Sequence, residues 1–119
     1  MAVEGLGEGD YAIRREGELL PVRIERKTLN DFFGCVGQSR ERFEAELERL
    51  RQYQSWLIIE SHADEIRAGF VRSRVSGEAA LGSAIHWAGI FGIHVVFTGN
   101  RHLGQRICQQ ALEEFAIHG

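Results

Sequence analysis

The stretch of sequence that decides the fold is Val22-Arg23-Ile24-Glu25-Arg26-Lys27-Thr28-Leu29-Asn30-Asp31. Val22 and Ile24 alternate with charged residues, and this alternation predicts a strand with one apolar face. The side chains at positions 23, 25 and 27 would then project from the other face. Three charged groups on one face are unusual for a purely structural strand, because a buried charge is costly unless it is paired or bound to a metal. The stretch therefore predicts a functional site at the end of this strand.

A second acidic residue, Asp10, lies upstream at the start of another short extended run. Gly17 supplies the flexibility for a turn between the two extended stretches. We therefore predict a β-hairpin that runs out along 10–15 and back along 19–26. Antiparallel pairing of these strands would bring Asp10 toward the end of the second strand, which carries Glu25.

The residue types at this edge of the predicted sheet suit metal-assisted cleavage of a phosphodiester. Hard divalent cations such as Mg²⁺ prefer carboxylate oxygens and keep several waters. We therefore predict that Asp10 and Glu25 bind Mg²⁺, for which Mn²⁺ can substitute. A bound metal polarises a phosphate and helps to generate hydroxide. Lys27 would orient the attacking water or stabilise the negative charge that develops.

The motif formed by these residues resembles that of a known family. A glycine directly before Asp10, followed by Glu25-Arg26-Lys27 and then Asp31, matches the G-D…E-R-K-x-x-x-D signature of the XPF-type nuclease domain. This domain is a branch of the PD-(D/E)XK nuclease superfamily. The resemblance implies that Asp10 and Glu25 bind the metal, that Lys27 is the catalytic lysine, and that Arg26 and Asp31 complete the site.

The resemblance covers nearly the whole chain. Arg42-Phe43 opens an amphipathic stretch, and Trp56-Leu57-Ile58-Ile59-Glu60 is similar to the family's apolar strand that ends in glutamate. The resemblance implies a restriction-endonuclease-like α/β core, with a mixed central sheet flanked by helices. It further implies a DNA endonuclease that acts on branched or flapped DNA and works as a homodimer or a heterodimer.

The N-terminus departs from the family pattern. The family carries another strand with a D-x-R-E motif before the G-D pair, whereas residues 1–8 show no strand pattern and contain glycines. We therefore expect residues 1–8 to be flexible and the strand with this motif to be missing. This departure favours an alternative function, a non-catalytic DNA-binding or scaffolding subunit of a nuclease complex. A third reading is an α/β domain whose charged strand end has no catalytic role.

The remaining sequence predicts a single domain, residues 1–119, with alternating helices and strands. The expected elements are helices over 28–36, 40–53, 63–68, 76–91 and 100–117, and strands over 56–60 and 93–97. The two strands and the helix over 76–91 would form a parallel β-α-β unit. That helix is apolar around most of its circumference, so we expect it to be buried or packed at an interface.

Two candidate residues of the site have structural alternatives. Asp31 follows Thr28 by three residues in a capping-box-like pattern, and an acid there is favoured by the helix dipole. Its role in capping and its role in the site both stay open. Glu60 follows an apolar strand, and it would either support the metal ligands or lie in solvent at the strand end.

The arginine content bears on nucleic-acid binding. The net charge of −3 disfavours strong non-specific binding to DNA, which relies on many cations that neutralise phosphates. The chain has a single lysine, so thirteen of its fourteen basic residues are arginines, which suit bidentate contacts with phosphate. Near the predicted site, we expect Arg14, Arg23, Arg40 and Arg42 to bind DNA.

The sequence shows neither a membrane segment nor a secretion signal. No apolar run approaches the ~20 residues that a membrane helix needs, and the N-terminus lacks the secretory pattern. We therefore expect no membrane partner, and a location in the nucleoid-associated cytoplasm of a prokaryote or in a eukaryotic nucleus. Cys35 and Cys108 are expected to be reduced thiols in the core.

Overall fold

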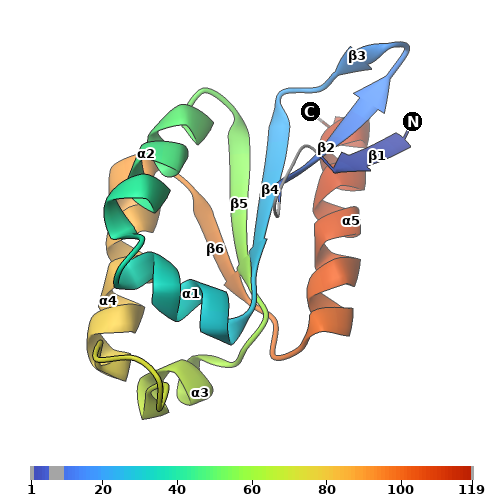
Figure 1. Cartoon of the computed structure of the whole chain (residues 1–119). Coiled ribbons are helices and arrows are strands. Elements are labelled where there is room, and N and C mark those ends of the chain that lie inside the picture. Colours follow the sequence, from blue (N-terminus) through green and yellow to red (C-terminus); the bar gives the residue numbers. More distant parts are fainter. Residues whose placement is uncertain (1, 6–9, 119) are drawn as a thin grey trace.

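A computed structural model describes residues 2–5 and 10–118, and it shows a mixed sheet with helices on both faces (Figure 1). The strands are β1 (Ala2–Gly5), β2 (Asp10–Arg15), β3 (Glu18–Leu19), β4 (Val22–Lys27), β5 (Gln54–Ile59) and β6 (His94–Phe97). Their order across the sheet is β1-β2-β4-β5-β6, and β3 pairs with β2. The pairs among β1 to β4 are antiparallel, whereas β4-β5 and β5-β6 are parallel.

The helices divide unequally between the two faces of the sheet. They are α1 (Leu29–Val36), α2 (Arg40–Leu50), α3 (Ala63–Ala68), α4 (Gly77–Phe91) and α5 (Arg101–His118). Figure 1 shows α1 to α4 on one face and α5 on the other. The larger apolar core, around Phe32, Leu57 and Trp87, lies under α1 to α4. The smaller core, around Ile24 and Leu112, lies under α5.

The predicted hairpin is confirmed, with a break in its return strand. Glu16 and Gly17 turn the chain with φ angles of 53° and 84°, as a tight hairpin turn requires. Pro21 interrupts the return strand between β3 and β4, since proline has no N–H to donate to a sheet. Beyond the break, β2 and β4 pair in a register that places residue 10 directly opposite Glu25.

The join between β4 and α1 positions the site. Thr28 caps α1, because its hydroxyl accepts a hydrogen bond of 3.2 Å from the backbone N–H of Asp31. Beside it, β5 runs parallel to β4, and the N–H of Glu60 donates to the carbonyl of Lys27 at 2.8 Å. The ends of two parallel strands therefore meet where the motif lies.

Most of the predicted elements are confirmed, and two predictions need correction. No strand was expected before Gly9, but Ala2–Gly5 form β1 and pair with β2, where Glu4 also forms an ion pair with Arg14. Residues 6–8 lie outside the described part of the chain. The second predicted helix, over 40–53, ends earlier, at Leu50.

The helix over 76–91 is buried on one face only. α4 buries Ala80, Ala84 and Trp87 against the sheet, while Ile85 and Ile90 are 71% and 53% exposed.

Among the described residues, no helix is long and apolar enough to cross a membrane. Cys35 and Cys108 are free and buried, as predicted, and burial raises the pKa of Cys108 to about 11.

Candidate active site

Glu25 lies in the interior of the protein beside Lys27. Strand alternation directs both side chains toward the face covered by α1 and α2. Glu25 is completely buried, and its Oε1 lies 3.2 Å from the Nζ of Lys27. The side chain of Lys27 is 18% exposed, and its ammonium lies 5.3 Å from the centroid of the Phe43 ring. Lys27 therefore lies between the buried carboxylate of Glu25 and the protein surface.

Both carboxylate oxygens of Glu25 lack a hydrogen-bond donor among the described residues. Lys27 is at ion-pair distance from Oε1 but does not have hydrogen-bond geometry. A buried polar group without a partner costs about 1–3 kcal/mol, and more when it is charged. Such groups in native structures are rare and often have a functional reason. The two unsatisfied oxygens fit a hard cation such as Mg²⁺, which prefers carboxylate ligands.

The backbone brings residue 10 to the same place. Its Cα is the direct partner of the Glu25 Cα in the antiparallel pair. The predicted convergence of these two positions at one edge of the sheet is thus confirmed for the backbone, whereas the Asp10 carboxylate lies outside the described part of the chain. Among the side chains that are described, no group of three or more His, Cys, Asp or Glu residues could hold a metal ion.

Arg26 and Glu60 form a separate ion pair on the α5 side of the sheet. The guanidinium Nη2 of Arg26 lies 2.5 Å from Oε2 of Glu60, and both side chains are nearly buried. Although burial opposes it, the hydrogen bond to Glu60 and the charge of Glu60 raise the pKa of Arg26 above its ordinary value. Arg26 and Glu60 thus connect the ends of β4 and β5, on the face opposite to Glu25 and Lys27.

A charged cleft of about 530 Å³ opens beside the end of β4. Four of the predicted site residues line it, namely Arg26, Lys27, Asp31 and Arg42. Asp31 lies in the first turn of α1 with its carboxylate exposed, and its backbone N–H donates to Thr28. The hydrogen bond to Thr28 uses the backbone N–H of Asp31 and leaves its carboxylate free to face solvent. Asp31 can therefore take part in the helix cap and also line the cleft.

Three of the four arginines that were predicted to bind DNA contact side chains outside the cleft. Arg42, by contrast, is exposed in the cleft, where it donates to the hydroxyl of Ser39 at 3.3 Å. The contacts of the other three are an ion pair of Arg14 with Glu4, stacking of Arg23 at 4.0 Å on the Tyr53 ring, and a 2.7 Å hydrogen bond from Arg40 to the Ser83 hydroxyl.

The structure adds two arginines to the candidate site. Arg72 and Arg74 lie between α3 and α4, and they line a second cleft of about 540 Å³ that adjoins the first. The sequence gives a weak signal for them, since the segment 67–74 is rich in arginine. That signal does not separate them from Arg67, which forms an ion pair with Glu78 instead.

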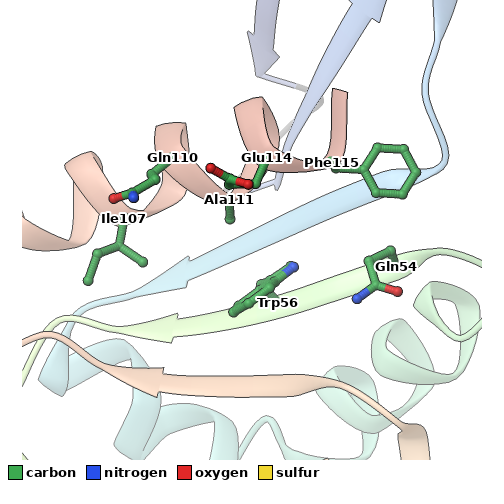
Figure 2. Close-up of a pocket in the computed structure, with 7 residues that line it drawn as sticks. All are labelled: Gln54, Trp56, Ile107, Gln110, Ala111, Glu114 and Phe115. Atoms are coloured by element: carbon green, nitrogen blue, oxygen red, sulfur yellow. The ribbon is translucent and has the colours of Figure 1, made fainter. Parts of the chain in front are cut away.

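The opposite face of the sheet carries an apolar groove of about 510 Å³. Figure 2 shows Gln54 and Trp56 on β5, below Ile107, Ala111 and Phe115 of α5. None of the described candidate residues lines this groove. The charged chemistry is therefore concentrated on the side of α1 and α2.

Comparisons with known proteins identify solved structures with a similar fold. No family model and no curated protein matches the sequence. The chain is similar to XPF from Aeropyrum pernix, with 19% identity and a TM-score of 0.69 over 97% of this chain and 52% of that one. It is also similar to XPF from Aeropyrum pernix in complex with DNA, with 18% identity and a TM-score of 0.62 over 82% of this chain and 46% of that one.

The chain thus spans about half the length of the solved structures that it matches. The likeness extends over both faces of the sheet, because it covers nearly all of this chain. It confirms the predicted α/β architecture, with a mixed central sheet flanked by helices. The chain has the fold of an XPF-type nuclease domain.

Proposed function

We propose that this domain is a Mg²⁺-dependent endodeoxyribonuclease that hydrolyses phosphodiester bonds in branched or flapped DNA. The observation that carries the proposal is the buried Glu25 carboxylate, whose two oxygens have no hydrogen-bond donor in the described part of the chain and whose backbone partner is Asp10. A strand built for packing alone would place an apolar side chain at this position. A buried carboxylate that accepts no hydrogen bond is better explained by a ligand that satisfies its oxygens.

Asp10 and Glu25 would hold the metal ion, and the ion would polarise the scissile phosphate and lower the pKa of a bound water. Lys27 lies between the Glu25 carboxylate and the cleft, with its side chain partly exposed. From this position it would orient the attacking water by hydrogen bonding and stabilise the negative charge that develops on the phosphate. Asp31 and Arg42 would border the bound strand, because both line the same cleft.

DNA is the substrate that the surroundings of the site favour. The cleft carries the cations Lys27 and Arg42, and a similar solved structure, that of XPF from Aeropyrum pernix, was determined in complex with DNA. The preference for branched or flapped DNA rests on the resemblance of the motif to the XPF-type family.

The Lys27→Ala variant tests the proposal. We expect it to lose cleavage of a fluorescently labelled flapped DNA by about 100-fold or more in Mg²⁺, the range in which a positioned acid–base group contributes. Arg49→Ala is the matched control, because it removes a cation from an exposed position of α2 outside the clefts. Circular dichroism would show that both variants are folded.

Two results would contradict the proposal. The first is a cleavage rate of the Lys27→Ala variant equal to that of the parent protein. The second is a parent protein that binds the same DNA and does not cut it with either Mg²⁺ or Mn²⁺. That second outcome would favour the alternative function, a non-catalytic DNA-binding or scaffolding subunit.

We further propose that the domain associates with a second copy of itself, or with a related chain, through α4. This helix of fifteen residues has one charged side chain, Glu78 in its first turn, and it exposes Ile85 and Ile90. Exposed apolar faces of this kind commonly mark interfaces between proteins.

A further inference from the structure

The two charged clefts adjoin each other along α1. The first begins at Lys27, and the second ends at Arg72 and Arg74 between α3 and α4. The two clefts share three lining residues, namely Asn30, Gly34 and Ser39. They therefore form one groove, which runs from the candidate active site across α1 to the 70–75 segment.

The cations of this groove are available to a ligand. The side chains of Arg72 and Arg74 form no hydrogen bond, ion pair or ring contact with any other described residue, and Arg42 donates a hydrogen bond to the hydroxyl of Ser39. Among the described residues that line the groove, Asp31 is the single acidic one. Arg26 also lines the groove, but it is paired with Glu60. Elsewhere on the protein, four more arginines lie within ion-pair distance of a glutamate, namely Arg14, Arg40, Arg51 and Arg67. The groove thus holds arginines that the fold leaves without an acidic partner.

Gly34 lies where the two clefts join, and the fold itself does not require a glycine there. A glycine in a helix interior is less stable than an alanine. A Cβ at position 34 would meet no atom within 4 Å, so packing does not explain the missing side chain. The absence of a side chain keeps the floor of the groove low at its midpoint. This feature suits a ligand whose backbone passes close to α1.

Phe70 adds an aromatic surface to the second half of the groove. Its ring stacks on Phe33, with the centroids 5.8 Å apart and an angle of 30° between the planes, and its other parts remain partly exposed. Arg72 and Arg74 follow it closely in the sequence. Sites for single-stranded nucleic acids combine a positively charged groove with aromatic rings on which bases stack.

We propose that this groove binds a single-stranded segment of DNA that leads away from the active site. The phosphates would contact Arg42, Arg72 and Arg74, the sugar–phosphate backbone would pass over Gly34, and a base would stack on Phe70. The inference deepens the proposed nuclease function, because it names the strand next to the cleaved bond. It can nevertheless be tested separately from cleavage.

The experiment measures binding of a fluorescently labelled oligo-dT by anisotropy, in EDTA so that no cleavage occurs. The double variant Arg72→Ala/Arg74→Ala should bind more weakly, and the slope of log K against log salt should become shallower by about 1.4, since each phosphate contact on a single strand contributes about 0.7. The matched control is Arg49→Ala/Arg106→Ala, which removes two exposed arginines outside the groove. It should keep the slope of the parent protein.

Two further changes test the shape of the groove. Gly34→Gln should weaken binding more than Gly34→Ala, although both should raise the melting temperature, because the longer side chain would fill the midpoint of the groove. Phe70→Leu keeps an apolar contact with Phe33 but removes the stacking surface. It should weaken binding about fivefold or more.

Three results would overturn the inference. One is a salt slope of the Arg72→Ala/Arg74→Ala variant equal to that of the control. Another is unchanged binding by Gly34→Gln. The third is equal competition for binding by a duplex DNA of the same length and by the single strand.

The test of the groove can be told apart from the test of the proposed function. Groove variants that lose DNA binding in a protein without cleavage activity would support the groove and refute the nuclease. If Lys27→Ala loses cleavage while the groove variants bind DNA normally, the nuclease is supported and the groove is refuted.

Discussion

Glu25 is the residue whose position is hardest to explain by folding alone. It is completely buried, and neither of its oxygens has a hydrogen-bond donor among the described residues. An apolar side chain of similar size would avoid the desolvation of a carboxylate. Lys27 offsets part of this cost through its charge at 3.2 Å. The remainder is consistent with a site that is completed by a bound cation.

Gly104 supports the site from the opposite face of the sheet. A Cβ at this position would lie 2.8 Å from Oε2 of Glu60 and 3.1 Å from the hydroxyl of Thr98. Because Glu60 is held by Arg26 at 2.5 Å, it cannot easily move away from an added methyl group. The glycine thus allows α5 to pack closely on the ends of β4 and β5.

Gly104→Ala should therefore destabilise the protein by about 1–3 kcal/mol, the usual cost of overpacking, although alanine is the better helix former. Gly34→Ala is the control, since its Cβ would meet open space. It should stabilise the protein by about 0.5–1 kcal/mol. Urea unfolding of the two variants measures both values, and a stabilised Gly104→Ala would show that α5 does not pack as described.

Local signals in the sequence were enough to predict most helices and strands. The alternation of Val22 and Ile24 with charged residues predicted β4, and Thr28 predicted the start of α1. The hairpin was predictable because Gly17 marks its turn, and pairing then placed residue 10 opposite Glu25. These features depend on neighbours in the sequence, so a local pattern carries them.

Features that depend on distant contacts were not predictable. β1 has too short a pattern to be recognised, and it is held by pairing with β2 and by the ion pair between Glu4 and Arg14. The contacts of Arg14, Arg23 and Arg40 have the same origin, because each arginine finds its partner through the tertiary fold. Strand alternation already places Arg26 on the face opposite to Glu25, whereas its pairing with Glu60 follows from the position of β5.

At the scale of the whole molecule, the charged groove and the exposed apolar surfaces lie on different parts of the protein. The charged groove lies over α1 and α2, while α4 exposes Ile85 and Ile90, and α5 borders an apolar groove on the other face of the sheet. Association through α4 would therefore bury apolar surface and leave the candidate active site open to DNA.

Ile85→Glu should shift the protein from dimer to monomer, because a charge in an apolar interface loses its hydration without gaining a partner. Light scattering after size-exclusion chromatography measures this change in mass. Val71→Glu is the control, since Val71 is 96% exposed and lies outside α4. A parent protein that is monomeric at all concentrations would contradict association through α4.

Metal-dependent stability tests the site as a whole most directly. Thermal unfolding of the parent protein and of Glu25→Gln would be compared in EDTA and in Mn²⁺. We predict that Mn²⁺ stabilises the parent, by about 2.7 kcal/mol at a hundredfold excess over its dissociation constant. Glu25→Gln should be no less stable than the parent in EDTA and should show no shift with Mn²⁺. Equal stabilisation of both proteins by Mn²⁺, or of neither, would contradict a metal site at Glu25.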